Sequence, residues 1–237
     1  MELENERLRN HRSTFLVFFC QTWHFEFLEI VVLRKGILIL MEHKLNMNSI
    51  GAISFNNALQ CLNSRDIEGA ELFLEQALLI DGDNALYLKI KGLCKYIKGQ
   101  FVEAKMCWMK VLSLDEEDID TKRYLSEFDS EDFKFYLENY NKCIGLMRGN
   151  PVKAIGILKS SIEQVPNVKG YELIGLLYYR LGLRKSALIF WKKALNMDIS
   201  NKTVQRYISV CKKCVFPLIV EKAIVEVLLV VGKLKLL

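Results

Sequence analysis

One short pattern of residues returns four times along the chain. Each time, a small residue is followed four positions later by a large apolar one, and a smaller residue comes three positions after that. The four occurrences are Ala70-Leu74-Ala77, Ala104-Trp108-Val111, Ala154-Leu158-Ser161 and Ala187-Trp191-Ala194. Residues three and four apart lie on one face of a helix. The first residues are 34, 50 and 33 positions apart, a period typical of stacked helical hairpins.

The composition supports an all-α fold. The chain has 237 residues, of which 51% are hydrophobic, so it can bury a sizeable core. It contains only 3 prolines and 13 glycines. An all-β fold with many tight turns, a collagen-like chain and a disordered linker would all need more of these residues.

A larger duplication is superimposed on the short pattern. Arg123-Tyr124-Leu125-Ser126 returns 83 positions later as Arg206-Tyr207-Ile208-Ser209. The same offset relates Gly92 to Gly175, Gly99 to Gly182, Ala104 to Ala187, Trp108 to Trp191 and Asp115 to Asp198. We therefore predict two hairpins and a closing helix, used twice, at residues 49–128 and 129–214. A closing helix with one polar face suits the place where stacking stops.

The two ends of the chain differ from the middle. Residues 1–48 form a hydrophobic extension, in which charged residues interrupt the apolar stretch 15–33 too much for a membrane span. A signal peptide is disfavoured because the chain opens with acidic residues and shows no small-residue cleavage site. Arg34-Lys35-Gly36 before Met41 is what an in-frame ribosome-binding site would encode, so a start at Met41 and a non-native 1–40 segment is a second hypothesis. Residues 215–237 are expected to form an apolar helix, either packed on the array or associated with a membrane surface.

The repeats resemble the tetratricopeptide repeat (TPR) family, whose unit is a 34-residue helix–turn–helix. The fourth unit, 168–201, matches the family's characteristic positions by residue type at Tyr171, Ile174, Gly175, Tyr178, Gly182, Ala187, Trp191 and Ala194. It departs only at Ile199, where the family has proline. The second unit carries Lys91 and Lys95, where apolar residues are usual. The resemblance covers about 165 residues and implies a right-handed α-solenoid of about four repeats plus capping helices.

The same resemblance implies a function and a site. In the family, the first helix of each unit lines a concave groove that holds a peptide or helix of a partner protein. That register places in the groove Lys89, Leu93, Tyr96, Tyr136, Asn139, Lys169, Glu172, Leu176 and Tyr179. Apolar and aromatic positions with scattered lysines suit an amphipathic helix with acidic flanks. The alternative is that many of these side chains pack against neighbouring helices.

Charge is distributed unevenly along the chain. Residues 41–134 hold 11 basic and 17 acidic residues, a net charge of −6, whereas residues 135–215 hold 14 basic and 4 acidic ones, a net charge of +10. A self-associating module that pairs acidic half with basic half is therefore an alternative function, and a membrane-peripheral assembly factor that uses 215–237 is another. The sequence disfavours nucleic acid as the partner, because no base-reading motif accompanies the basic half.

Nothing in the sequence indicates catalysis, a cofactor or a metal. His11, His24 and His43 all precede the repeats, and no phosphate-binding glycine loop is present. The only CxxC motif, Cys211 to Cys214, has no second pair to complete a zinc site. Seven cysteines without a secretory signal suggest reduced thiols. We therefore expect a cytoplasmic, non-enzymatic adaptor or scaffold that acts by protein–protein interaction.

Overall fold

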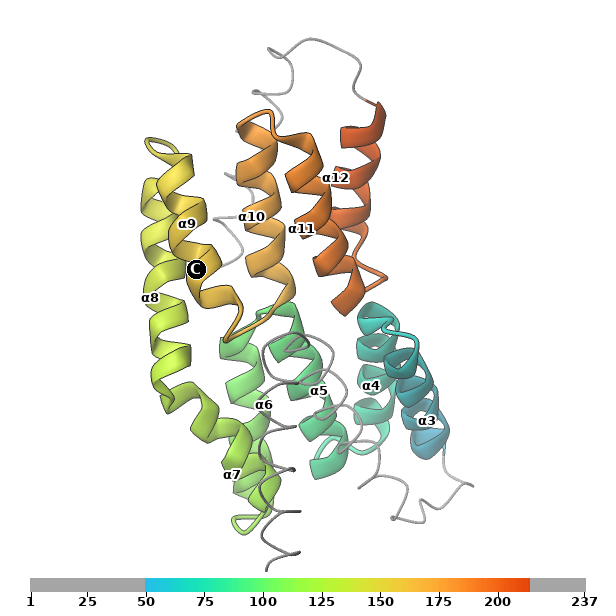
Figure 1. Cartoon of the computed structure of the whole chain (residues 1–237). Coiled ribbons are helices and arrows are strands. Elements are labelled where there is room, and N and C mark those ends of the chain that lie inside the picture. The colour runs from blue at the N-terminus through green and yellow to red at the C-terminus, as the bar shows by residue number, and fades with distance from the viewer. Residues whose placement is uncertain (1–49, 214–237) are drawn as a thin grey trace, which may run out of the picture. The chain divides into compact units, whose positions relative to one another are not determined.

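A computed structural model describes residues 50–213, which belong to one compact unit, Leu45–Leu237 (Figure 1). The predictions for the extension 1–48 and the tail 215–237 lie outside the described residues. Between 50 and 213 the chain is helical throughout and has no strand. The elements are α3 (Ile50–Asn63), α4 (Ile67–Ile80), α5 (Ala85–Lys98), α6 (Phe101–Leu114), α7 (Ile119–Ser126), the 3-10 helix η1 (Glu127–Asp129), α8 (Glu131–Leu146), α9 (Pro151–Ile162), α10 (Val168–Arg180), α11 (Arg184–Met197) and α12 (Lys202–Lys213).

Successive helices pack as antiparallel hairpins, α3 with α4, α5 with α6, α8 with α9 and α10 with α11. Helices α7 and α12 follow the second and fourth hairpins. The all-α fold and the helical solenoid are therefore confirmed. We refer below to residues 50–129 as the first half and to residues 131–213 as the second half.

Local sequence signals account for where the helices begin. Seven of the described helices start after an Asp, Asn or Ser whose side chain accepts a hydrogen bond from a backbone N–H of the first turn, which satisfies a donor that has no partner within the helix. These residues are Asp66, Asn84, Asp118, Ser130, Asn150, Asn167 and Asn201. The turns between α5 and α6 and between α10 and α11 use Gly99 and Gly182 at φ 78° and 75°, a conformation that favours glycine.

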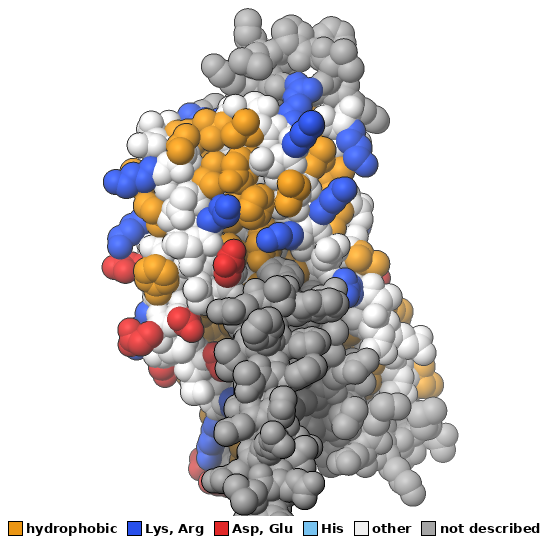
Figure 2. Space-filling model, viewed as in Figure 1, with side chains coloured by type: hydrophobic (Ala, Val, Ile, Leu, Met, Phe, Trp, Pro, Cys, Tyr) orange, Lys and Arg blue, Asp and Glu red, His pale blue; other side chains and the backbone are white. Residues whose placement is uncertain are grey.

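The repeated small–large–small pattern forms the interior. All twelve side chains at the pattern positions are at most 2% exposed. Large hydrophobic side chains also reach the surface, among them Val152, Leu183 and Ile189 in the second half. On the face drawn in Figure 2, orange hydrophobic side chains of the second half lie among blue Lys and Arg side chains. The repeat thus marks the core, and the surface of the second half is partly apolar and mainly basic.

The 83-residue duplication extends to atomic contacts. The indole Nε1 of Trp108 donates to the carbonyl of Lys89 at 3.1 Å, and that of Trp191 donates to the carbonyl of Glu172 at 3.3 Å. A Cβ added to Gly92 would lie 2.8 Å from Cε2 of Trp108, and one added to Gly175 would lie 2.9 Å from Cε2 of Trp191. Each glycine therefore admits the tryptophan of the next helix at the same place in the two halves.

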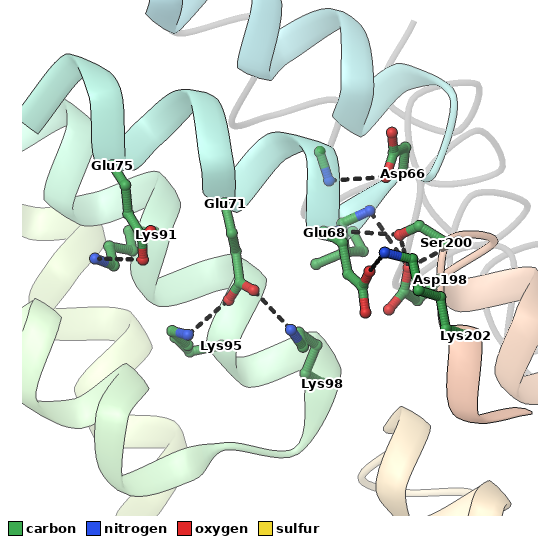
Figure 3. Close-up of polar contacts among 12 residues, drawn as sticks. Asp66, Glu68, Glu71, Glu75, Lys91, Lys95, Lys98, Asp198, Ser200 and Lys202 are labelled. Carbon is green, nitrogen blue, oxygen red and sulfur yellow. Dashed lines mark hydrogen bonds and ion pairs between the residues drawn. The ribbon is translucent and has the colours of Figure 1, made fainter.

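The charged departures from the TPR pattern on α5 are matched by acidic residues on α4 (Figure 3). Lys91 pairs with Glu75 at 3.4 Å. Lys95 and Lys98 pair with Glu71 at 2.9 and 2.6 Å, and Glu71 is only 8% exposed. Burial by itself would raise the pKa of Glu71, but the two ammonium groups outweigh it and leave the pKa below its ordinary value. The α4–α5 contact is thus partly ionic where the family's is apolar.

The two halves meet through turns that are far apart in sequence. The backbone N–H of Ile199 donates to the carbonyl of Arg65 at 2.9 Å, and the N–H of Glu68 donates to Oγ of Ser200 at 3.0 Å. Figure 3 shows this contact between the start of α4 and the α11–α12 turn. A second contact lies beside it, because a Cβ on Gly99 would be 2.7 Å from Oδ1 of Asn167. We call these two contacts the joint.

Asp198 is the central acceptor of the joint. Its Oδ1 accepts from the N–H of Ser200 at 3.1 Å, from the Ser200 hydroxyl at 2.6 Å and from the N–H of Ile67 at 3.4 Å. The residue has no exposed surface. Burial raises the pKa of the Asp198 carboxyl, although the hydrogen bonds from Ser200 act in the opposite direction. The joint therefore holds a buried carboxylate by backbone and hydroxyl donors.

Two substitutions at Asp198 should distinguish the contribution of its hydrogen bonds to stability from that of its charge. Asp198→Ala leaves the donors of Ser200 and Ile67 without an acceptor and should lower the free energy of unfolding by about 1–3 kcal/mol. Asp198→Asn retains an acceptor oxygen and removes a buried charge, so its effect should stay within about 1 kcal/mol. The matched control is Asp115→Ala at the exposed counterpart 83 positions earlier, expected within about 0.5 kcal/mol. Urea denaturation measures all three, and equal costs for Asp198→Ala and Asp115→Ala would contradict this role.

Candidate protein-binding groove

Helices α5 and α10 form a continuous inner column. Helix α10 begins where α5 ends, since a Cβ on Gly99 would lie 3.2 Å from Cβ of Lys169. Figure 1 shows α10 above α5 in the same orientation. Every residue of both helices is buried or half-buried. The TPR register places seven of the nine groove positions in this column, three on α5 and four on α10.

The charged groove positions are half-buried. Lys89 is paired with Asp118, the residue that caps α7, and this pair lowers the pKa of Asp118 against the opposing effect of burial. Lys169 and Glu172 lie one turn apart at the start of α10 and are half-buried too. The column therefore carries both signs of charge at partly accessible positions. Asp118 was not among the predicted groove residues, and its position as a helix cap gave no sign of the pairing with Lys89.

The apolar and aromatic positions on α5 contribute to packing. Leu93 is 5% exposed. Tyr96 is half-buried, and its ring centroid lies 5.3 Å from that of Phe101, 5.9 Å from that of Trp108 and 6.0 Å from that of Phe128. Burial raises the pKa of Tyr96. The phenol is therefore neutral at physiological pH and sits in an aromatic cluster.

The corresponding positions on α8 and α10 are more deeply buried. Tyr136 is 1% exposed, and its hydroxyl donates to Oδ1 of Asn167 at 3.2 Å. Asn139, on the same helix, is 5% exposed. Leu176 and Tyr179 on α10 are 5% and 4% exposed, and the Tyr179 ring centroid lies 5.6 Å from that of Trp191.

The nine positions thus divide by accessibility. Lys89, Tyr96, Lys169 and Glu172 are half-buried, and the other five are buried. The structure brings the α5 and α10 positions into one column, and it places Tyr136 of α8 against Asn167 at the start of α10. Whether a partner contacts any of them stays a prediction. The five buried side chains can support such a contact, and the four half-buried ones can make it without repacking the helices.

The described residues hold no cluster suited to metal chemistry. Between 50 and 213, no group of three or more His, Cys, Asp or Glu side chains is arranged to hold a metal ion. The three histidines and Cys214 of the CxxC motif lie outside that range. Cys94 and Cys143 are buried thiols, and burial raises the pKa of Cys143 to about 12. A thiolate nucleophile is therefore disfavoured at Cys143 near neutral pH.

In the part of the chain that the structure describes, every helix is too short or too polar to cross a lipid bilayer. The apolar tail 215–237, to which the membrane-association hypothesis refers, is not part of it. The hypothesis stays a prediction.

Comparison with known proteins adds little to this description. No protein-family model matches the sequence, and no curated protein matches it. Among solved structures, the chain is similar to one titled "MamA RS-1 ArsTM double mutant", with 16% sequence identity, 80% of this chain and 97% of that chain covered, and a TM-score of 0.32. A likeness at that TM-score supports no shared partner or activity. The basis for assigning a function is therefore the chain's own helical hairpins and the side chains they place.

Proposed function

We propose that this protein is a non-enzymatic scaffold of TPR type that binds a segment of a partner protein along α5 and α10. The observation that supports the proposal is the inner column itself. It combines half-buried Lys89, Tyr96, Lys169 and Glu172 with an apolar floor that includes Leu93 and Leu176. Binding surfaces of this kind gain affinity from a desolvated apolar centre and specificity from a few polar groups at its margin.

The kind of segment follows from these side chains. A helix with apolar residues at i, i+3, i+4 and i+7 can lay one face against an apolar floor. Lys89 and Lys169 carry ammonium groups at half-buried positions of this column, beside which an acidic residue of such a helix would lie. We therefore propose an amphipathic helix that carries at least one Asp or Glu beside its apolar face.

The cellular setting and the domain organisation belong to the same proposal. We place the protein in the cytoplasm, where thiols stay reduced. Cys61, Cys94, Cys107 and Cys143 are free thiols, which supports this location. We also propose that residues 49–128 and 129–214 are two duplicated subdomains, supported by the matching contacts of Trp108 and Trp191.

Selection from a random peptide library tests the proposal with the full chain as bait. Peptides of about 16 residues are long enough for four helical turns. The enriched sequences should show helical apolar spacing with acidic residues beside it. A selected peptide should bind Lys169→Glu at least about tenfold more weakly, a loss of about 1.4 kcal/mol.

The matched control is Lys192→Glu, which makes the same charge change at an exposed position of α11. It should bind the selected peptide like the unsubstituted chain, since surface charges away from the site have little effect on affinity. Circular dichroism first establishes that both variants are helical. Equal binding to both variants would place the site away from the α10 end of the column and would contradict the proposal.

A further inference from the structure

The joint is built from the α3–α4 and α5–α6 turns of the first half and the α9–α10 and α11–α12 turns of the second. Each of these turns has a counterpart in the other half that takes no part in the joint. Under the duplication, the first pair corresponds to the α8–α9 and α10–α11 turns, and the second pair corresponds to the α4–α5 and α6–α7 turns. Figure 1 shows these counterparts at opposite ends, the former two at the top and the latter two at the bottom.

The counterpart of the Asp198 turn has the same geometry but is exposed. Asp115 and Asp198 each end a helix, with φ and ψ of −142° and 96° for Asp115 and −141° and 96° for Asp198. Each Oδ1 accepts from the N–H two residues later, at 3.0 Å from Glu117 and at 3.1 Å from Ser200. Asp198 is buried in the joint, whereas Asp115 is exposed. The α6–α7 turn is therefore a preformed copy of the surface that receives the start of α4.

The counterpart of the Gly99 contact is also open. Gly99 and Gly182 share the left-handed backbone conformation, at φ 78° and 75°. Asn167 lies against Gly99, but no atom of residues 50–213 outside its immediate neighbours lies within 4 Å of a Cβ placed on Gly182. At the other end, Asn84 corresponds to Asn167, and each caps the helix that follows it. Gly182 and Asn84, the counterparts of Gly99 and Asn167, are thus both present, but they do not contact each other within one molecule.

The two open ends have opposite charge. Residues 81–84 and 115–120 hold seven Asp or Glu and no Lys or Arg, and we call them the acidic end. Residues 147–153 and 180–185 hold five Lys or Arg and no Asp or Glu, and we call them the basic end. Glu116, Glu117, Arg148 and Lys185 are exposed. The two surfaces are therefore complementary in charge as well as in their place in the duplication.

We propose that a second copy of this chain docks its acidic end on the basic end of the first and repeats the joint between molecules. Such a head-to-tail contact is heterologous, so it can continue into a linear assembly. Because the two ends lie at opposite ends of the unit, one molecule cannot close the contact on itself. The observations that carry the proposal are the duplicated turn geometry, its exposure at both ends and the opposite charge.

The intermolecular contact differs from the joint in a way that makes it depend more on charge. Pro151 is the first residue of α9, as Ile67 is the first residue of α4. In the joint the N–H of Ile67 donates to Asp198, but proline has no N–H to donate to Asp115. Glu117 occupies the position of Ser200 and would bring a carboxylate to the start of α9, where the helix dipole favours negative charge. Exposed ion pairs are screened by salt, so the assembly should be sensitive to ionic strength.

Sedimentation velocity of the full chain tests the proposal. At about 0.02 M salt the sedimentation coefficient should rise with protein concentration, and at about 0.5 M it should stay at the monomer value. Glu116→Lys/Glu117→Lys reduces the charge of the acidic end from −7 to −3, and Arg148→Glu/Lys185→Glu reduces that of the basic end from +5 to +1. Each variant alone should remain monomeric at the low-salt concentration at which the unsubstituted chain assembles. An equimolar mixture of the two should form dimers, because the unaltered basic end of the first variant then meets the unaltered acidic end of the second.

The control for net charge is Glu131→Lys/Glu138→Lys, which makes the same change on exposed positions of α8. It should still assemble. An unsubstituted chain that stays monomeric at low salt would overturn the proposal. Undiminished assembly of either double variant, or a mixture of the two that forms no dimer, would overturn it too.

Discussion

Replacing Gly175 by alanine is expected to lower the free energy of unfolding by about 2–3 kcal/mol. The added Cβ would lie 2.9 Å from Cε2 of Trp191, and the indole is held in place by its hydrogen bond to the carbonyl of Glu172. A rigid ring cannot move away as a flexible side chain would, so helices α10 and α11 must separate. Chemical denaturation of the full chain measures the loss, and Gly92→Ala should reproduce it in the first half.

Gly156 provides the matched control, because it is also helical and, among the described residues, nothing beyond its own helix backbone lies within 4 Å of a Cβ placed there. Gly156→Ala should leave stability unchanged or raise it by about 0.5–1 kcal/mol. In a Trp191→Leu background the cost of Gly175→Ala should shrink, since the clash is with the indole. Equal effects of Gly175→Ala and Gly156→Ala would show that the glycine–tryptophan contact is not what fixes the helix spacing.

Replacing Glu71 by alanine is expected to cost about 2–3 kcal/mol near neutral pH. The Glu71 side chain is 11% exposed, and Lys95 and Lys98, at 18% and 21%, would lose their shared carboxylate while remaining largely covered. Glu138→Ala is the control, because the Glu138–Lys142 pair is 66% and 55% exposed and should be worth less than about 0.5 kcal/mol. Urea denaturation distinguishes the two, and similar costs would mean that burial adds nothing to the ion pair.

The Glu71 effect should also depend on pH. Its pKa in the folded state lies below the ordinary value, the lysines outweighing burial. The contribution is therefore fully present above the unfolded pKa of about 4.3 and disappears as pH falls through the folded pKa. The stability difference between the unsubstituted chain and Glu71→Gln should shrink at about pH 3 relative to about pH 7. A difference that grew on acidification would contradict the lowered pKa.

The core of this fold could be predicted from sequence because its signal is local. A small residue at one position and a tryptophan four later specify a close helix contact wherever they recur, and Ala104, Trp108, Ala187 and Trp191 are all buried as expected. The offset of 83 residues likewise preserved the hydrogen bonds of both indoles. Periodicity and residue size were sufficient for these elements.

The joint and the accessibility of the groove positions could not be predicted in the same way. Arg65 and Ile199 meet across more than half the chain, and no local pattern marks either of them. Tyr136 has the register of a groove residue, yet the ring of Phe101 on α6 lies 5.9 Å from it and Asn167 accepts its hydroxyl. Lys95 looked out of place on α5 because its partner, Glu71, lies on another helix. Each of these outcomes depends on which turns and helices the fold brings together. Composition and spacing do not determine that.

Photo-crosslinking with a library-selected peptide tests the central claim, that α5 and α10 form the partner-binding surface. A benzophenone on the apolar face of the peptide leaves the protein unaltered, and mass spectrometry then locates the adducts. The account predicts adducts within residues 85–98 and 168–180, lost when unlabelled peptide competes. Adducts confined to the outer faces of α4, α6 or α11 would contradict it.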